Sequence, residues 1–306
     1  MLDNFLNKSK PINFVVLLAI FFAILLYSLL TDLYKDNFSS SKILESLLII
    51  LLFVVAFFFV NFIVLKNKLT YDNSYAFFFY TTLFVYFLPE TLHLKTLSSN
   101  IIYLLILRKI YSLNSSKQLF KKTFDAGFWL GIFFIFEPFS LPLLILLYAS
   151  IYIHKKATIN SLIIPFIGFL TPLIVYFTYL FWFDKTKNIY DLFVFDFFSK
   201  NQIESKVLYC LIPIISLSII SIFFKTAKIF SINNTFQKKW TILLINFSFC
   251  ILFFIVNPSK NYENVIYLIF PTAIILANGI ELIRKPLIKN IFLYLFLICS
   301  FIIYFL

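Results

Sequence analysis

Long blocks of apolar residues run along this chain, and short polar or charged stretches separate them. Most blocks approach the roughly 20 residues that a helix needs to cross a hydrocarbon core of about 30 Å. The fourth block is short and begins with polar residues, and the pattern leaves open whether it crosses fully. We predict eleven spans, near residues 12–31, 43–65, 75–89, 97–107, 124–136, 139–153, 160–182, 206–224, 240–257, 264–281 and 289–306.

The composition agrees with this pattern and excludes a soluble single-core protein. Hydrophobic residues make up 61% of the chain, against roughly 45–50% in soluble domains. The cysteines, Cys210, Cys250 and Cys299, all fall within apolar blocks and lack the spacing of a disulfide framework or metal site. We therefore predict an all-α polytopic bundle that forms a single integral membrane domain over residues 1–306.

The basic residues set the predicted topology. The net charge is +12, but the lysines and arginines lie in short loops between apolar blocks rather than on a soluble face that binds nucleic acid. With a cytoplasmic N-terminus, inside loops hold 18 of the 26 basic residues and outside loops hold 8. This asymmetry follows the positive-inside rule, so we predict that the N-terminus is cytoplasmic.

The run from Phe124 to Ile153 contains an acid next to a proline, Glu137 and Pro138, at its middle. A single helix of this length would be about 45 Å long and would place the acid near the bilayer centre. A single span would also leave 14 basic residues in inside loops and 12 in outside loops, which is a weaker asymmetry. We therefore predict a helical hairpin over 124–153, with Glu137 at the outer surface.

Acidic residues gather on the predicted outer side. They include Asp32 and Asp36 after the first span, where a four-residue spacing would put both on one helical face. Glu90 and Glu137 lie at the outer rim. The longest outer loop, 183–205, is rich in aromatic residues and is predicted to lie at the membrane interface.

The segment from Glu90 to Ile153 resembles the GT-C superfamily of glycosyltransferases, which use lipid-linked sugars. The resemblance rests on apolar patterning and on small and turn residues of the hairpin, namely Ala126, Gly127, Gly131, Pro138 and Pro142. The whole chain also resembles small integral membrane proteins of the Bacteroidetes that carry no assigned reaction. These resemblances imply a GT-C-like fold in the bacterial inner membrane.

The GT-C resemblance implies a set of candidate site residues at the outer face. Asp32 or Asp36 would act as the catalytic base on an acceptor hydroxyl. Glu90 and Glu137 would bind the acceptor sugar or a divalent cation, the one cofactor considered. Lys95 would contact the phosphate of a polyprenyl-phosphate lipid. The chain differs from the superfamily at Glu137, where a lysine is usual, and in its first outer loop, which is short.

Three functions stay open at this point. The first is a non-catalytic or degenerate member that serves cell-envelope assembly, with the lipid bilayer and other envelope membrane proteins as partners. The second is a glycosyltransferase that uses a polyprenyl-phosphate-linked sugar. The third is a transporter or flippase, although the predicted spans carry few ionisable residues.

Overall fold

Every regular element in the described part of the chain is a helix. The computed structural model describes residues 1–32, 40–187, 189, 192–193, 205–229, 234–256 and 261–305. The principal helices are α1 (Leu2–Leu6), α2 (Pro11–Asp32), α3 (Ser40–Asn67), α4 (Tyr75–Tyr86), α5 (Leu88–Thr91), α6 (Leu94–Ser112), α7 (Leu119–Phe136), α8 (Leu143–Ile153), α9 (Ile159–Trp182), α11 (Ser205–Ile229), α12 (Asn234–Val256), α13 (Asn261–Ile280) and α14 (Pro286–Phe305), with a short 3₁₀ turn η1 (Pro138–Ser140).

Helices occupy the positions of all eleven predicted spans, and within the described residues seven helices are long and apolar enough to cross a membrane. These seven identify the chain as a membrane protein, whereas the count of eleven crossings stays a prediction. The remaining helices are α4 and α8, which are shorter, and α6 and α7, which carry charged or polar residues near their ends. The candidate spans are Pro11–Thr31, Ser40–Asn67, Ile159–Trp182, Tyr209–Ile229, Asn234–Val256, Glu263–Ile280 and Pro286–Tyr304.

The chain divides into two compact units. Unit 1 comprises residues Met1–Leu97, Ile203–Asn233 and Val265–Leu306, and unit 2 comprises Ser98–Gln202 and Asn234–Asn264. Both units are therefore discontinuous in sequence, and two of the four boundaries between them fall within α6 and α13.

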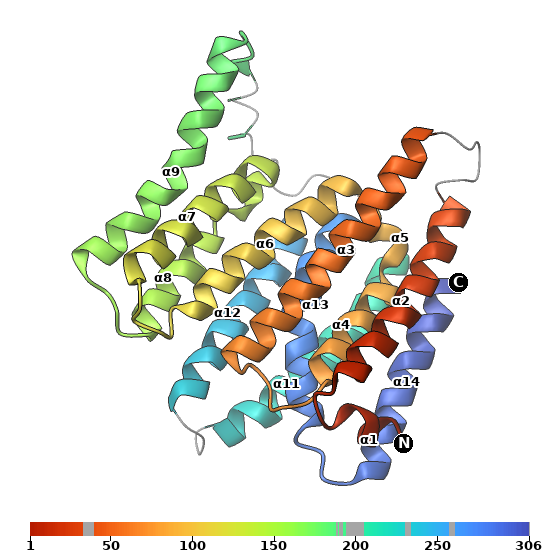
Figure 1. Ribbon diagram of the computed structural model, residues 1–306. Coiled ribbons are helices and arrows are strands. Elements are labelled where there is room, and N and C mark those ends of the chain that lie inside the picture. The colour runs from red at the N-terminus through yellow and green to blue at the C-terminus, as the bar shows by residue number, and fades with distance from the viewer. Residues whose placement is uncertain are drawn as a thin grey trace. The chain divides into compact units, whose positions relative to one another are not determined.

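The centre of unit 1 is α4, all of whose residues are buried. It packs against α2, α3 and α14, which surround it in Figure 1. Phenylalanine rings fill this contact. The ring centre of Phe21 in α2 lies 5.0 Å from that of Phe53 and 4.7 Å from that of Phe57, both in α3. The ring centre of Phe84 in α4 lies 5.3 Å from that of Phe53. A helix that is apolar on all sides is typically buried among other elements, as α4 is here.

In unit 2, α7 and α9 pack closely through glycine (Figure 1). A Cβ built on Gly127 would lie 2.0 Å from the carbonyl oxygen of Pro165, and one built on Gly168 would lie 2.4 Å from that of Phe124. Gly127 and Gly131 thus form a small-residue face on α7, against which the backbone of α9 packs closely.

The run 124–153 is broken at Glu137. α7 ends at Phe136, Glu137 adopts an extended conformation with φ −136° and ψ 89°, and α8 begins at Leu143. A local contribution to the break comes from Pro138, because a proline ring disfavours the helical conformation in the residue before it. Glu137 is only 3% exposed, which corrects the prediction of a solvated acid. The η1 turn that follows it is covered by α12.

Candidate functional site

A buried ion pair joins α11 to the end of α13 in unit 1. The Nζ atom of Lys225 lies 3.1 Å from Oε2 of Glu281, and the two side chains are 1% and 4% exposed. Oε1 of Glu281 accepts hydrogen bonds from the Tyr71 backbone N–H at 2.9 Å and from Nδ2 of Asn73 at 2.7 Å. Such a pair is stable only when its remaining donors and acceptors are satisfied, and here both carboxylate oxygens have partners.

The same contacts hold the segment between α3 and α4 in place. Lys225 Nζ lies 5.0 Å from the centre of the Tyr71 ring, an arrangement that favours a cation–π contact. Asn278 of α13 donates from Nδ2 to the carbonyl oxygen of Leu69 at 3.1 Å. These contacts hold together α11, α13 and residues 68–74 at one end of unit 1.

A second polar cluster lies around Asp3 of α1. Its carboxylate accepts a hydrogen bond from the Tyr75 hydroxyl, and its Oδ1 lies 3.7 Å from Nζ of Lys289. The Asp3 backbone N–H donates to Oδ1 of Asn290 at 2.8 Å. The cluster attaches α1 to the starts of α4 and α14.

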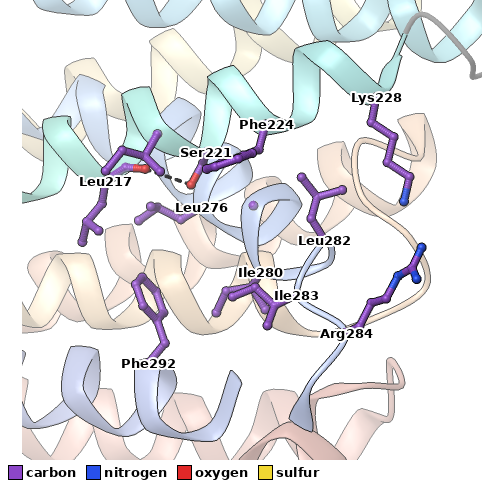
Figure 2. A pocket seen from close by; sticks show the side chains of 12 residues that line it. Leu217, Ser221, Phe224, Lys228, Leu276, Ile280, Leu282, Ile283, Arg284 and Phe292 are labelled. Carbon is purple, nitrogen blue, oxygen red and sulfur yellow. Dashed lines mark hydrogen bonds between the residues drawn. The ribbon is translucent and has the colours of Figure 1, made fainter. Parts of the chain in front are cut away.

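A pocket of about 550 Å³ opens beside the ion pair, between α11, α13 and α14 (Figure 2). The α11 residues that line it recur every three or four positions and so share one helical face. The full lining comprises Leu217, Ile220, Ser221, Phe224 and Lys228 of α11, Leu276, Gly279 and Ile280 of α13, Leu282, Ile283 and Arg284 of the following segment, and Phe292 of α14. Its size is that of a typical ligand site, roughly 300–1,000 Å³.

Gly279 lines this pocket at a close contact between α13 and α11. A Cβ at this position would lie 2.3 Å from Oγ and 2.7 Å from Cβ of Ser221, so only glycine allows α13 to approach α11 this closely. The Ser221 hydroxyl donates to the Leu217 carbonyl oxygen of its own helix at 2.9 Å. Its proton is therefore donated within α11, and most of the other side chains that line the pocket are apolar.

The charged groups of the pocket lie together at one end. Figure 2 shows Lys228 and Arg284 with their nitrogen atoms directed toward the same region, while Leu217 and Phe292 lie at the opposite end. Both cations are exposed. The pocket thus combines a long apolar lining with a cationic mouth.

Unit 2 has a basic end of its own. Lys122 Nζ donates to the carbonyl oxygen of Ser112 at 2.9 Å, and Lys156 Nζ donates to that of Leu113. These lysines donate hydrogen bonds to carbonyl groups at the C-terminal end of α6, which have no partner within the helix. An ion pair of 2.5 Å between Lys109 and Asp125 links α6 to α7.

His154 lies buried after α8 at this basic end. Burial, together with the positive charges of Lys156, Lys238 and Lys239, lowers the pKa of its imidazole to about 4. Its Nε2 atom has no hydrogen-bond partner among the described residues. His154 is accordingly neutral at pH 7.

Of the candidate site residues inferred from the sequence, Lys95 and Glu137 have described side chains, and neither lines the pocket. Asp32 is the last residue of α2 and Glu90 belongs to α5, but their side chains, like Asp36 as a whole, lie outside the described residues. Lys95 is exposed in the first turn of α6, in unit 1, and Glu137 is buried in unit 2. Their proposed catalytic and substrate-binding roles stay predictions.

Sequence reasoning used Lys225, Lys228 and Arg284 as markers of membrane side and missed their local roles. One signal was available: Glu281 is one of few acids on the predicted inner side, close to several cations. No cluster of three or more His, Cys, Asp or Glu side chains suited to a metal ion occurs within the described ranges.

Comparison with known proteins identifies the family of this chain. No curated protein and no solved structure is significantly similar to this chain. The model of a family of unknown function, DUF6427, matches residues 1–306. Because the match covers the whole sequence, the chain belongs to the DUF6427 family.

Proposed function

We propose that this protein is a non-catalytic multi-pass membrane protein that binds a membrane lipid in the pocket between α11, α13 and α14. The observation that supports this proposal is the pocket itself, which is lined mostly by apolar side chains on helices long enough to cross a bilayer. Ile220 and Phe224 of its lining are 51% and 60% exposed. On a membrane-spanning helix, such residues face lipid, so an acyl chain can enter the pocket without crossing water.

The ionisable groups next to the pocket support binding rather than chemistry. The acid closest in sequence to its lining, Glu281, accepts hydrogen bonds from Tyr71 and Asn73 and pairs with Lys225. A catalytic acid or base must come within hydrogen-bond reach of a substrate atom. Glu281 instead uses its carboxylate to join helix ends.

We place this lipid-binding protein in the bacterial inner membrane, as a GT-C-like member that serves cell-envelope assembly. The support is the sequence resemblance of residues 90–153 together with the apolar helices. Glycosyltransferase activity is the alternative, and it depends on Asp32 and Asp36. Cells that carry Asp32→Asn and Asp36→Asn at normal expression, with unchanged surface glycans, would argue against that alternative.

Lipid binding can be tested by filling the pocket from its lipid-facing side. The full-length protein is purified in mild detergent, and retained lipid is counted by native mass spectrometry. We expect Ile220→Trp to reduce lipid retention, because the larger ring occupies the pocket. Ile219→Trp is the matched control: Ile219 is 56% exposed on the same helix but does not line the pocket.

Equal lipid retention by the wild type, Ile220→Trp and Ile219→Trp would refute the proposed function. Loss of lipid in both variants would also contradict it, because the effect would then follow from a tryptophan anywhere on this face of α11. Circular dichroism on each preparation confirms that the helical content is unchanged.

A further inference from the structure

We propose that unit 2 binds a phosphate group at its basic end, between His154, Lys156 and Lys238. The site belongs to unit 2 and does not depend on the lipid-binding pocket, whose lining belongs to unit 1. Two observations support it. A buried imidazole nitrogen lacks a hydrogen-bond partner among the described residues, and lysines from two different elements lie near that ring.

The turn that ends α8 positions two of these residues. Lys155 adopts a left-handed conformation with φ 56°, and the Lys156 backbone N–H donates to the Ile151 carbonyl oxygen at 3.0 Å. This hydrogen bond closes a Schellman turn, in which glycine is the usual residue at the left-handed position. The chain leaves the axis of α8 at this turn, and the Lys156 side chain reaches the Leu113 carbonyl oxygen at the end of α6.

His154, the residue before the left-handed position, supplies a buried polar group. It is only 7% exposed, and its Nε2 atom has no hydrogen-bond partner among the described residues. The imidazole is neutral at pH 7, so one of its two nitrogens carries a proton. Because Lys155 beside it is exposed, the ring lies just below the surface of unit 2. With the proton on Nε2, the ring can donate to an oxygen atom of a ligand.

The third residue comes from another helix. Lys238 lies in the second turn of α12, which packs against α8. The end of α6 and the start of α12 lie at the same end of unit 2 in Figure 1. Lys156 and Lys238 are both half-buried, and the positive charges of both act on the His154 ring. One N–H of the Lys156 ammonium group is donated to Leu113, which leaves two for a ligand.

The charges at this end favour an anion. Burial and the positive charges of Lys122 and Lys238 lower the pKa of Lys156. Asp125, an acid of α7 at this end, is paired with Lys109 at 2.5 Å. An anion between Lys156 and Lys238 would replace repulsion between the two ammonium groups by attraction of each to the ligand.

The number and type of donors match a phosphate. A phosphate monoester has three strong acceptor oxygens and a charge of about −1.5 to −2 at neutral pH. One imidazole N–H and two ammonium groups, which come from two elements, can each contact a different oxygen. The phosphate belongs either to a soluble compound or to the headgroup of a lipid, since both carry the same acceptor group.

The site can be tested by nuclear magnetic resonance of the histidine rings. The chain contains two histidines, His93 and His154, so ¹⁵N-histidine labelling of the full-length protein gives two sets of ring signals. The His93→Gln variant assigns them. The protein in phosphatidylcholine bicelles at pH 7 is titrated with inorganic phosphate, and sodium chloride of the same ionic strength is the reference. In a second arm, phosphatidic acid replaces part of the phosphatidylcholine.

We expect the phosphate group to shift the His154 signals and to leave those of His93 unchanged. Lys238→Gln should weaken this binding about tenfold, because one charge-assisted contact is lost. The matched control is Lys10→Gln, which removes the same charge from an exposed position in unit 1 and should bind like the wild type. Lys238→Arg keeps the charge and should retain most of the affinity, which separates loss of the contact from misfolding.

The two arms identify the source of the phosphate. A shift with inorganic phosphate supports the site and assigns it to soluble compounds, whereas a shift with phosphatidic acid alone supports it and assigns it to a lipid headgroup. If neither shifted the His154 signals, or if sodium chloride shifted them equally, the proposal would be overturned. Unchanged affinity in Lys238→Gln, or an equal loss in Lys10→Gln, would refute a site that includes Lys238.

Discussion

Replacing Glu281 by leucine is expected to destabilise unit 1 strongly. The substitution leaves the ammonium group of Lys225 without this counter-ion in a site where both side chains are almost fully buried. It also removes the acceptor for the Tyr71 N–H and for Asn73. Breaking a buried pair by removing one partner typically costs about 3–5 kcal/mol, and we expect Glu281→Leu to fall in that range.

The reverse substitution should cost less. In Lys225→Met the carboxylate keeps the donors Tyr71 and Asn73, and methionine retains much of the apolar stem of the lysine. The double variant Lys225→Met with Glu281→Leu should recover part of the loss, because it leaves no unpaired charge. We expect a coupling free energy of about 2 kcal/mol between the two positions.

These free energies can be measured by unfolding the purified protein in mixed micelles with sodium dodecyl sulfate and following helical circular dichroism. Lys228→Met, one turn further along α11 at an exposed position, is the matched control and should change stability by less than about 0.5 kcal/mol. A cost below about 1 kcal/mol for Glu281→Leu, or no recovery in the double variant, would show that the pair does not fasten these helices.

Three further substitutions test unit 2 through the same unfolding measurement. Gly127→Ala should destabilise by about 1–3 kcal/mol, because its methyl group would collide with the Pro165 carbonyl; an unchanged midpoint would contradict the close α7–α9 contact. The pKa of His154 is about 4 in the folded chain and about 6.5 in the unfolded chain. The stability that it contributes is therefore present above pH 6.5 and is lost toward pH 4, by up to about 3 kcal/mol. The His154→Gln variant should show a smaller change in unfolding free energy over this pH range. Tyr103→Phe should cost about 1 kcal/mol, because the buried Tyr103 hydroxyl donates to Asn246 Oδ1 at 2.9 Å; no change would exclude that contact.

The helices could be located from the sequence because apolar blocks of membrane length are a local signal. The break at Glu137 also has a local contribution, since Pro138 disfavours the helical conformation in the residue before it. The burial of Glu137 was not local, because it depends on packing around the turn that follows it. In a membrane protein, an acid beside a turn is compatible with either a solvated or a buried position.

The pocket was beyond the reach of sequence patterns for a related reason. Lys225 and Glu281 are 56 positions apart, and each stands at the end of its own apolar block. Charges at such ends normally mark membrane side, so nothing local distinguishes the buried pair from Lys228 and Arg284 at the pocket mouth. Only the three-dimensional arrangement of α11, α13 and α14 assigns them different roles.

The contacts of Asp3 have a consequence for biosynthesis. Asp3 and Asn290, which its backbone N–H contacts, are 287 positions apart, and the whole of unit 2 is encoded between them. A ribosome therefore releases α1 and α4 long before the start of α14 exists. Contacts of such long sequence separation form late and slowly. The α1 cluster is accordingly among the last contacts to close, and unit 2 has the opportunity to fold in the membrane while unit 1 is still incomplete.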